Sequence, residues 1–222
     1  MKIVLDSSTL ISISSNCLMS IFTRYCTRSN IEAIITPSVY LESVSNPLNI
    51  KRFQLNAIRI KDAVDAGKIN VAVKDLTLTK ESERLMQIAN NIASVKGKSL
   101  KLVHQGEAET LALMKKESAQ VLAVDERTTR MLLESPEGMR SFLGKRYGEA
   151  IEISQESASA LRNEIKGLAI IRSVELIALA YSANCFEPDL ESTPKALEAA
   201  LYAAKFAGCA VSFDEISEYL FK

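Results

Sequence analysis

Two aspartates each follow a short apolar run and precede residues typical of a helix start. Asp6 follows the apolar residues 3–5 and is succeeded by three hydroxyl side chains, and Asp125 follows the apolar residues 121–124. Short apolar runs of this kind are typical of buried strands. Because open α/β sheets bind ligands and metals at the carboxyl ends of their strands, both carboxylates are candidates for a functional site.

Two glutamates are expected near the same edge of the sheet. Glu42 lies early in a helix that the pair Thr36-Pro37 begins, and Glu107 opens a helix directly after Gly106. If the strands that end in Asp6 and Asp125 are neighbours, all four carboxylates converge. Carboxylates held together repel one another and raise each other's pKa unless a cation is bound.

Hard divalent cations with oxygen ligands would relieve this repulsion, and Mg²⁺ or Mn²⁺ retains waters that can be activated. A metal pair about 4 Å apart can stabilise both the attacking water and the leaving oxygen in phosphodiester hydrolysis. The sequence does not distinguish one metal ion from two. It predicts that Asp6, Glu42, Glu107 and Asp125 bind the metal and form the catalytic cluster.

Structural explanations exist for the same residues. Asp6 and Asp125 are each suited to cap the helix that follows, and Glu42 fits an exposed helix position. Glu107 and Glu109 would favour the amino terminus of their helix electrostatically. Glu126 and Arg130 have the spacing of an ordinary i, i+4 ion pair.

The elements that must position these residues alternate between strands and helices. Apolar runs at 3–5, 31–35, 69–73 and 121–124 predict strands, with 150–153 as the last one. The alternation predicts a three-layer α/β/α fold with a mostly parallel sheet of four to five strands and right-handed crossovers. We expect this domain to span residues 1–155.

Residues 156–222 are predicted to form a helical extension packed on that domain or at a dimer interface. Segments 163–184 and 194–207 are strongly apolar, and we expect each to be a helix. The first leaves little polar face, which suggests a buried helix and raises the hypothesis of homodimerisation through the C-terminal helices.

Composition excludes several classes of protein. Lys plus Arg and Asp plus Glu number 27 each, so there is no global basic field, and any polyanion site must be a local patch. His104 is the single histidine, which disfavours paired-histidine ribonucleases, histidine-rich zinc sites and Ser-His-Asp triads. Four scattered cysteines, no signal peptide and no membrane-spanning apolar stretch predict a cytoplasmic protein.

Basic residues flank two of the acids. Lys98 and Lys101 precede Glu107, and Arg127 and Arg130 follow Asp125. Side chains of this kind fix phosphates without distinguishing bases. These four cations are therefore candidates for substrate binding, although charge runs are also typical of solvated surfaces.

The order of these motifs resembles the PIN domain, in its prokaryotic and archaeal type. The resemblance rests on Asp6 with Ser8, on Glu42, on the segment 106–109, and on Asp125-Glu126 with Arg130, and it covers roughly residues 1–155. PIN domains are metal-dependent nucleases that act mostly on RNA. The resemblance thus implies an endoribonuclease in which a metal-activated water, held by the acidic cluster, hydrolyses RNA phosphodiester bonds.

The resemblance also implies roles for single residues. Asp6 and Asp125 would be the principal ligands, Glu42 would complete the cluster, and Glu107 would be the third acid, with Glu109 as the alternative at that place. Ser8 and Glu126 would support the cluster, and Arg130 would contact phosphate. Toxin-type PIN proteins are generally shorter than this chain, and nothing in the sequence indicates an antitoxin partner, an RNA substrate or a cleavage sequence.

Two other functions remain open. A non-catalytic RNA-binding or scaffolding protein could keep the same fold, and metal-dependent cleavage would separate it from a nuclease. A small-molecule phosphate- or nucleotide-binding α/β protein would normally have a glycine-rich first turn, which residues 6–10 lack.

Overall fold

The computed structural model describes residues 1–220, and it has a five-stranded, all-parallel sheet at its centre. The strands lie in the order β3-β2-β1-β6-β8. Their bounds are β1 Lys2–Leu5, β2 Glu32–Ile35, β3 Asn70–Val71, β6 Val121–Ala123 and β8 Ala169–Ile171. The predicted three-layer α/β/α class with a mostly parallel sheet is confirmed, and β1 and β6 are neighbours as the acidic cluster requires.

Helices cover both faces of this sheet. The side chains of β1 alternate between two buried clusters: Ile3 and Leu5 belong to one and Val4 to the other. The first cluster is built largely from α1 Ser7–Ser15, α2 Met19–Arg28, α3 Pro37–Tyr40, α4 Gln54–Asp65, α10 Ser173–Ser182, α11 Pro194–Phe206 and α12 Phe213–Leu220. The second is built largely from α5 Leu76–Asn90, α6 Gln105–Lys116, α7 Arg127–Glu134, α8 Pro136–Tyr147 and α9 Gln155–Glu164.

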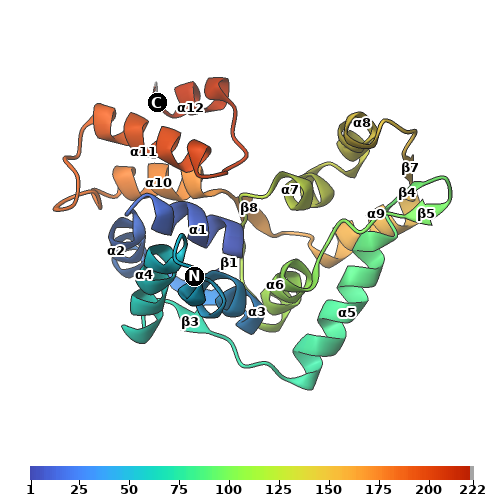
Figure 1. The fold of residues 1–222 in the computed structure, drawn as a ribbon, viewed down its shortest axis with the longest axis horizontal. Helices are drawn as coiled ribbons and strands as arrows, with labels where there is room; N and C mark the ends of the chain where they lie inside the picture. The colour runs from blue at the N-terminus through green and yellow to red at the C-terminus, as the bar shows by residue number, and fades with distance from the viewer. Residues whose placement is uncertain (221–222) are drawn as a thin grey trace.

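Short elements complete the chain. A π-helical turn, η1 Leu41–Ser45, continues α3 and carries Glu42, and a 3₁₀ turn, η2 Pro47–Asn49, follows it. A small antiparallel sheet is formed by β4 Ala93–Val95, β5 Lys98–Ser99 and β7 Glu152–Ile153, in the order β5-β4-β7. This sheet and α8 lie at the opposite end of the molecule from α11 and α12 (Figure 1).

Two sequence-based expectations about the strands were wrong. Residues 150–153 do not supply the last strand of the main sheet, because β7 pairs with β4 in the small sheet. The expected helix 163–184 is interrupted: Gly167 has a φ of 85°, and β8 follows it and pairs with β6 before α10 begins. A short apolar run has no periodicity that separates a buried strand from a buried helix, which explains the second error. The first error concerns strand pairing, which depends on the distant partner β4.

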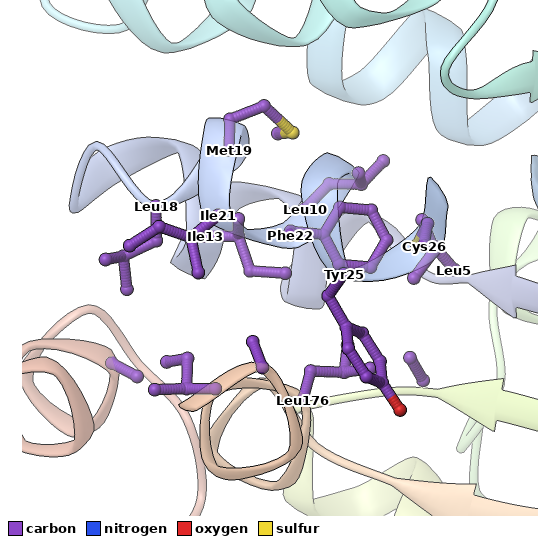
Figure 2. Close-up of a cluster of buried hydrophobic side chains, with 14 of the residues drawn as sticks. Leu5, Leu10, Ile13, Leu18, Met19, Ile21, Phe22, Tyr25, Cys26 and Leu176 are labelled. Atoms are coloured by element: carbon purple, nitrogen blue, oxygen red, sulfur yellow. The ribbon is translucent and has the colours of Figure 1, made fainter. Parts of the chain in front are cut away.

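The C-terminal segment is therefore joined to the main sheet. β8 lies beyond residue 155, where the first domain was expected to end, and still forms the outermost strand next to β6. From α10, Leu176 projects towards the side chains of α1 and α2 in a shared buried cluster (Figure 2). Among residues 1–220, no helix is both long and apolar enough to cross a membrane.

Candidate functional site

Asp6 lies where β1 ends and α1 begins. Its backbone N–H donates to the carbonyl oxygen of Ala123 at 2.9 Å, so the β1–β6 pairing continues up to this residue. Its Oδ2 accepts hydrogen bonds from the backbone N–H of Ser8 at 3.0 Å and from Ser8 Oγ at 2.6 Å. Asp6 thus caps α1, and it is only 5% exposed. Burial raises the pKa of this carboxyl, and the charge of Asp125 adds to the effect.

Ser8 connects the two strand ends that carry the aspartates. Its hydroxyl donates to Asp6 and accepts from the backbone N–H of Asp125 at 3.0 Å. One side chain therefore fixes the spacing between Asp6 and the backbone of Asp125.

The carboxylate of Asp125 is held by the C-terminal segment. Its Oδ1 accepts from the backbone N–H of Ser173 at 2.7 Å and from Thr9 Oγ1 at 3.4 Å, and its Oδ2 accepts from Ser173 Oγ at 2.7 Å. The residue is 1% exposed. Asp125 therefore anchors the first turn of α10 through both oxygens, a structural role that the sequence analysis did not foresee.

Glu107 lies at the third position of α6 and faces the Asp6 side of the sheet edge. Its Oε2 accepts from the backbone N–H of His104 at 2.6 Å, which closes a capping box, and its Oε1 accepts from Thr129 Oγ1 at 2.8 Å. Burial raises the pKa of Glu107, and the charges of Asp6 and Glu126 contribute in the same direction.

Glu42 approaches the same helix start from η1. A β-carbon added at Gly106 would lie 2.8 Å from Glu42 Oε1, so only glycine at this position lets the carboxylate come so close. Desolvation raises the pKa of Glu42, as does the negative charge of Asp6, although the residue as a whole is exposed. Asp6, Glu42 and Glu107 thus lie in one shared negative field at the carboxyl edge of the sheet.

Glu109 has different surroundings from Glu107. It is fully buried, its Oε2 accepts from the backbone N–H of Ser38 at 3.0 Å, and its Oε1 lies 3.2 Å from Lys74 Nζ. Burial alone would raise its pKa, but the hydrogen bonds from Ser38 and the Lys74 ammonium outweigh it and hold the pKa below its usual range. Glu109 ties α6 to the start of α3, so Glu107 is the better candidate ligand of the two.

No group of three or more His, Cys, Asp or Glu side chains within the described part of the chain is arranged to hold a metal ion. Hydrogen bonds explain why: Asp125 is turned to Ser173, and Glu107 caps α6. The donor chemistry nevertheless suits Mg²⁺ or Mn²⁺, because Asp6, Glu42 and Glu107 offer hard oxygen atoms, and the negative charge of Asp6 raises the pKa of both glutamates.

Three of the predicted cations and supporting residues lie at the start of α7: Glu126, Arg127 and Arg130. Glu126 caps α7 by accepting from the backbone N–H of Thr129 at 2.6 Å. Arg130 pairs with Glu134 at 3.0 Å, so the expected Glu126–Arg130 ion pair does not form. The guanidinium of Arg127 lies 4.9 Å from the centre of the Phe142 ring.

A cavity of about 290 Å³ opens beside Glu107. Its walls include Lys101, His104, Glu126, Arg146 and Tyr147. Lys101 is thus placed beside the acidic cluster, whereas Lys98 is exposed on β5 in the small sheet.

Sequence reasoning missed Ser173 and Thr9, which bind Asp125, and Ser38 and Lys74, which bind Glu109. Ser173 lies in the middle of the segment 163–184, which was expected to be one helix, so the sequence carries no signal for its contact with Asp125. Comparison with protein-family models, with curated proteins and with solved structures finds no match.

Proposed function

We propose that this chain is a metal-dependent endoribonuclease with a PIN-like arrangement of acids at the carboxyl edge of its sheet. The observation that carries the proposal is the grouping of Asp6, Glu42 and Glu107, whose pKa values are all raised by burial and by neighbouring negative charge. Such a grouping is costly for stability and is typical of functional sites. RNA enters the proposal through the motif order and the basic residues beside the cluster.

Each residue has a defined part in this proposal. Asp6, Glu42 and Glu107 would hold the cation through their oxygen atoms, and Ser8 would orient Asp6 through its 2.6 Å hydrogen bond. Asp125 would act as a positioning residue, since Ser173 binds both of its oxygens. A bound Mg²⁺ or Mn²⁺ would supply positive charge at the scissile phosphate and would acidify the attacking water.

One observation favours a second candidate, a non-catalytic RNA-binding or scaffolding protein. The engagement of Asp125 with Ser173 takes one predicted ligand out of the cluster. A chain that binds RNA without cleaving it would need the basic surface and no metal.

The test is cleavage of end-labelled single-stranded and structured RNA with Mn²⁺, Mg²⁺ or EDTA. We expect cleavage by the wild type with either metal, none in EDTA, and a loss of at least about 100-fold in Asp6→Asn and Glu107→Gln, as is usual when electrostatic stabilisation of a transition state is removed. Calorimetric titration with Mn²⁺ alone gives a second readout, and both variants should bind it more weakly.

Glu117→Gln is the matched control, because it neutralises a carboxylate on the opposite end of α6 that pairs with Lys2 at the surface. It should cleave RNA and bind Mn²⁺ as the wild type does. Metal-independent cleavage, or full activity in Asp6→Asn, would refute the nuclease proposal. A folded wild type that binds RNA and neither binds Mn²⁺ nor cleaves would support the scaffolding alternative.

A further inference from the structure

A second cavity, between α7 and α8, is lined by positive charge. It has a volume of about 620 Å³, and its charged side chains are Arg127, Lys145 and Arg146. Ser141, Met131 and Phe142 also contribute to its walls. No carboxylate with a described side chain lines this cavity, although the protein as a whole carries equal numbers of acidic and basic residues.

These three cations lack the ion pairs that neutralise several other basic residues of the protein. Arg84 and Lys115 are neutralised by Glu81 and Glu164, and Arg172 by Glu175 and Glu215. Arg127, Lys145 and Arg146 have no ion pair with any described residue and remain exposed. The cavity therefore keeps an uncompensated positive potential that favours an anion.

The position of Arg127 is unfavourable with respect to the helix dipole. Lys145 and Arg146 lie in the last turn of α8, where cations interact favourably with the helix dipole. Arg127 is the first residue of α7, where a cation is electrostatically unfavourable. Its guanidinium instead lies over the Phe142 ring of α8 at 4.9 Å, which aims it at the cavity shared by the two helices.

The cavity shares one wall residue with the cavity beside Glu107. Arg146 lines both, and in the second it accompanies Lys101, His104 and Tyr147. Tyr147 is 47% exposed, and the centre of its ring lies 6.0 Å from the Arg146 guanidinium. Phosphate-binding cations beside an exposed aromatic ring are the combination by which proteins hold single strands, whose bases are free to stack.

We propose that the α7–α8 cavity binds a backbone phosphate of a single-stranded nucleic acid whose chain continues past Tyr147 to the acidic edge. The path of the nucleic-acid chain towards the acidic edge rests on the proposed function. Binding of a phosphate in the α7–α8 cavity does not require that the protein cleave RNA. Arg127 and Lys145 hold the phosphate, and Arg146 connects it with the cavity beside Glu107.

The test measures binding in EDTA, where metal-dependent cleavage cannot occur. The probes are a short fluorescent single-stranded RNA of mixed sequence, its single-stranded DNA counterpart and the corresponding duplex, each titrated between about 50 and 200 mM salt. The variant is Arg127→Gln/Lys145→Gln. The control is Lys51→Gln/Lys195→Gln, which removes the same charge from two exposed lysines outside these cavities.

We expect the cavity variant to bind both single strands about tenfold more weakly and to lose about one unit of salt-dependence slope, since one phosphate contact disappears. The control should bind as the wild type does, and both variants should remain folded, with a single cooperative thermal transition. Equal binding by variant and control, stronger binding of the duplex than of the single strands, or no binding by the wild type would overturn the proposal.

Different experimental results would refute the nuclease proposal and the phosphate-site proposal. If the wild type binds through the cavity but never cleaves, the nuclease proposal falls and the phosphate site stands. If the wild type cleaves and the cavity variant has an unchanged KM for single-stranded RNA, the phosphate site falls and the nuclease proposal stands.

Discussion

At the scale of single residues, Ser8, Asp125 and Ser173 form a continuous chain of hydrogen bonds from the first strand to the tenth helix. Ser8 links Asp6 to the backbone of Asp125, and Ser173 binds both carboxylate oxygens of Asp125. A buried carboxylate needs such donors, because an unpartnered charge in the interior is strongly destabilising. The same bonds fix where the Asp6 carboxylate lies.

Ser173→Ala should lower the free energy of unfolding by about 2 kcal/mol, because it removes a hydrogen bond to a buried charged group. Urea denaturation measures the change. Ser182→Ala is the control on the same helix, since its exposed hydroxyl bonds only the carbonyl oxygen of Ala178 and its loss should have little effect. Equal stability of the two variants would contradict an anchoring role for Asp125.

Glu109→Gln should cost about 2 kcal/mol of stability at neutral pH, since it removes a buried charge that accepts from Ser38 and pairs with Lys74. The pKa of Glu109 is lowered in the folded state, so its contribution is present above the unfolded pKa and is lost as the pH falls through the folded value. The difference from wild type should therefore shrink below about pH 4. Mn²⁺ affinity should be unchanged, in contrast to Glu107→Gln.

At the scale of elements, the C-terminal segment is joined both to the main sheet and to the helices that cover it. β8 pairs in parallel with β6, and α10 packs on α1 and α2 through residues such as Leu176 (Figure 2). The apolar face that suggested homodimerisation is thus largely covered by the chain's own helices. The dimer stays a prediction, and the mass in solution would test it.

A fragment of residues 1–155 should not fold cooperatively. It would lack β8, would expose the side of β6 and the core residues that contact α10, and would leave the Asp125 carboxylate without Ser173. Amide exchange and urea unfolding of the fragment and the full chain measure this. A single sharp transition in the fragment would establish the boundary near residue 155 as a domain boundary.

At the scale of the whole molecule, charge is distributed unevenly although it sums to zero. Ion pairs from Arg84 and Lys115 to Glu81 and Glu164 join α5, α6 and α9. Acids gather at the sheet edge, and uncompensated cations gather between α7 and α8. An acidic centre bordered by a basic surface suits a substrate that carries phosphates and a cation that bridges them to carboxylates.

Stability should depend on pH through the acidic edge. The pKa of Asp6 is raised in the folded state, so its favourable contribution is complete below the unfolded pKa and is lost as the pH rises through the folded value. In EDTA, the stability of the wild type relative to Asp6→Asn should fall as the pH rises above about 4.

Mn²⁺ at about 100 times its Kd should restore roughly 2.7 kcal/mol to the wild type at neutral pH and much less to Asp6→Asn. Thermal denaturation over a pH series, with and without Mn²⁺, measures both effects. A flat pH dependence of the difference between wild type and variant, or equal stabilisation of both by Mn²⁺, would count against a metal site at Asp6.

The sequence alone determined the α/β class, the strands that end in Asp6 and Asp125, and the helix starts that precede Glu42 and Glu107, whereas the pairing of those two strands came from the tertiary structure. Apolar runs, capping residues and glycine or proline at helix ends act over a few residues, and the sequence displays them directly. Only the tertiary structure decided that residues 169–171 form a strand, that Ser173 binds Asp125, and that Glu109 turns to Ser38 and Lys74. These outcomes depend on residues that are distant in the chain. The residues next to a short apolar run or a lone carboxylate do not indicate which strand it pairs with or which donor it binds.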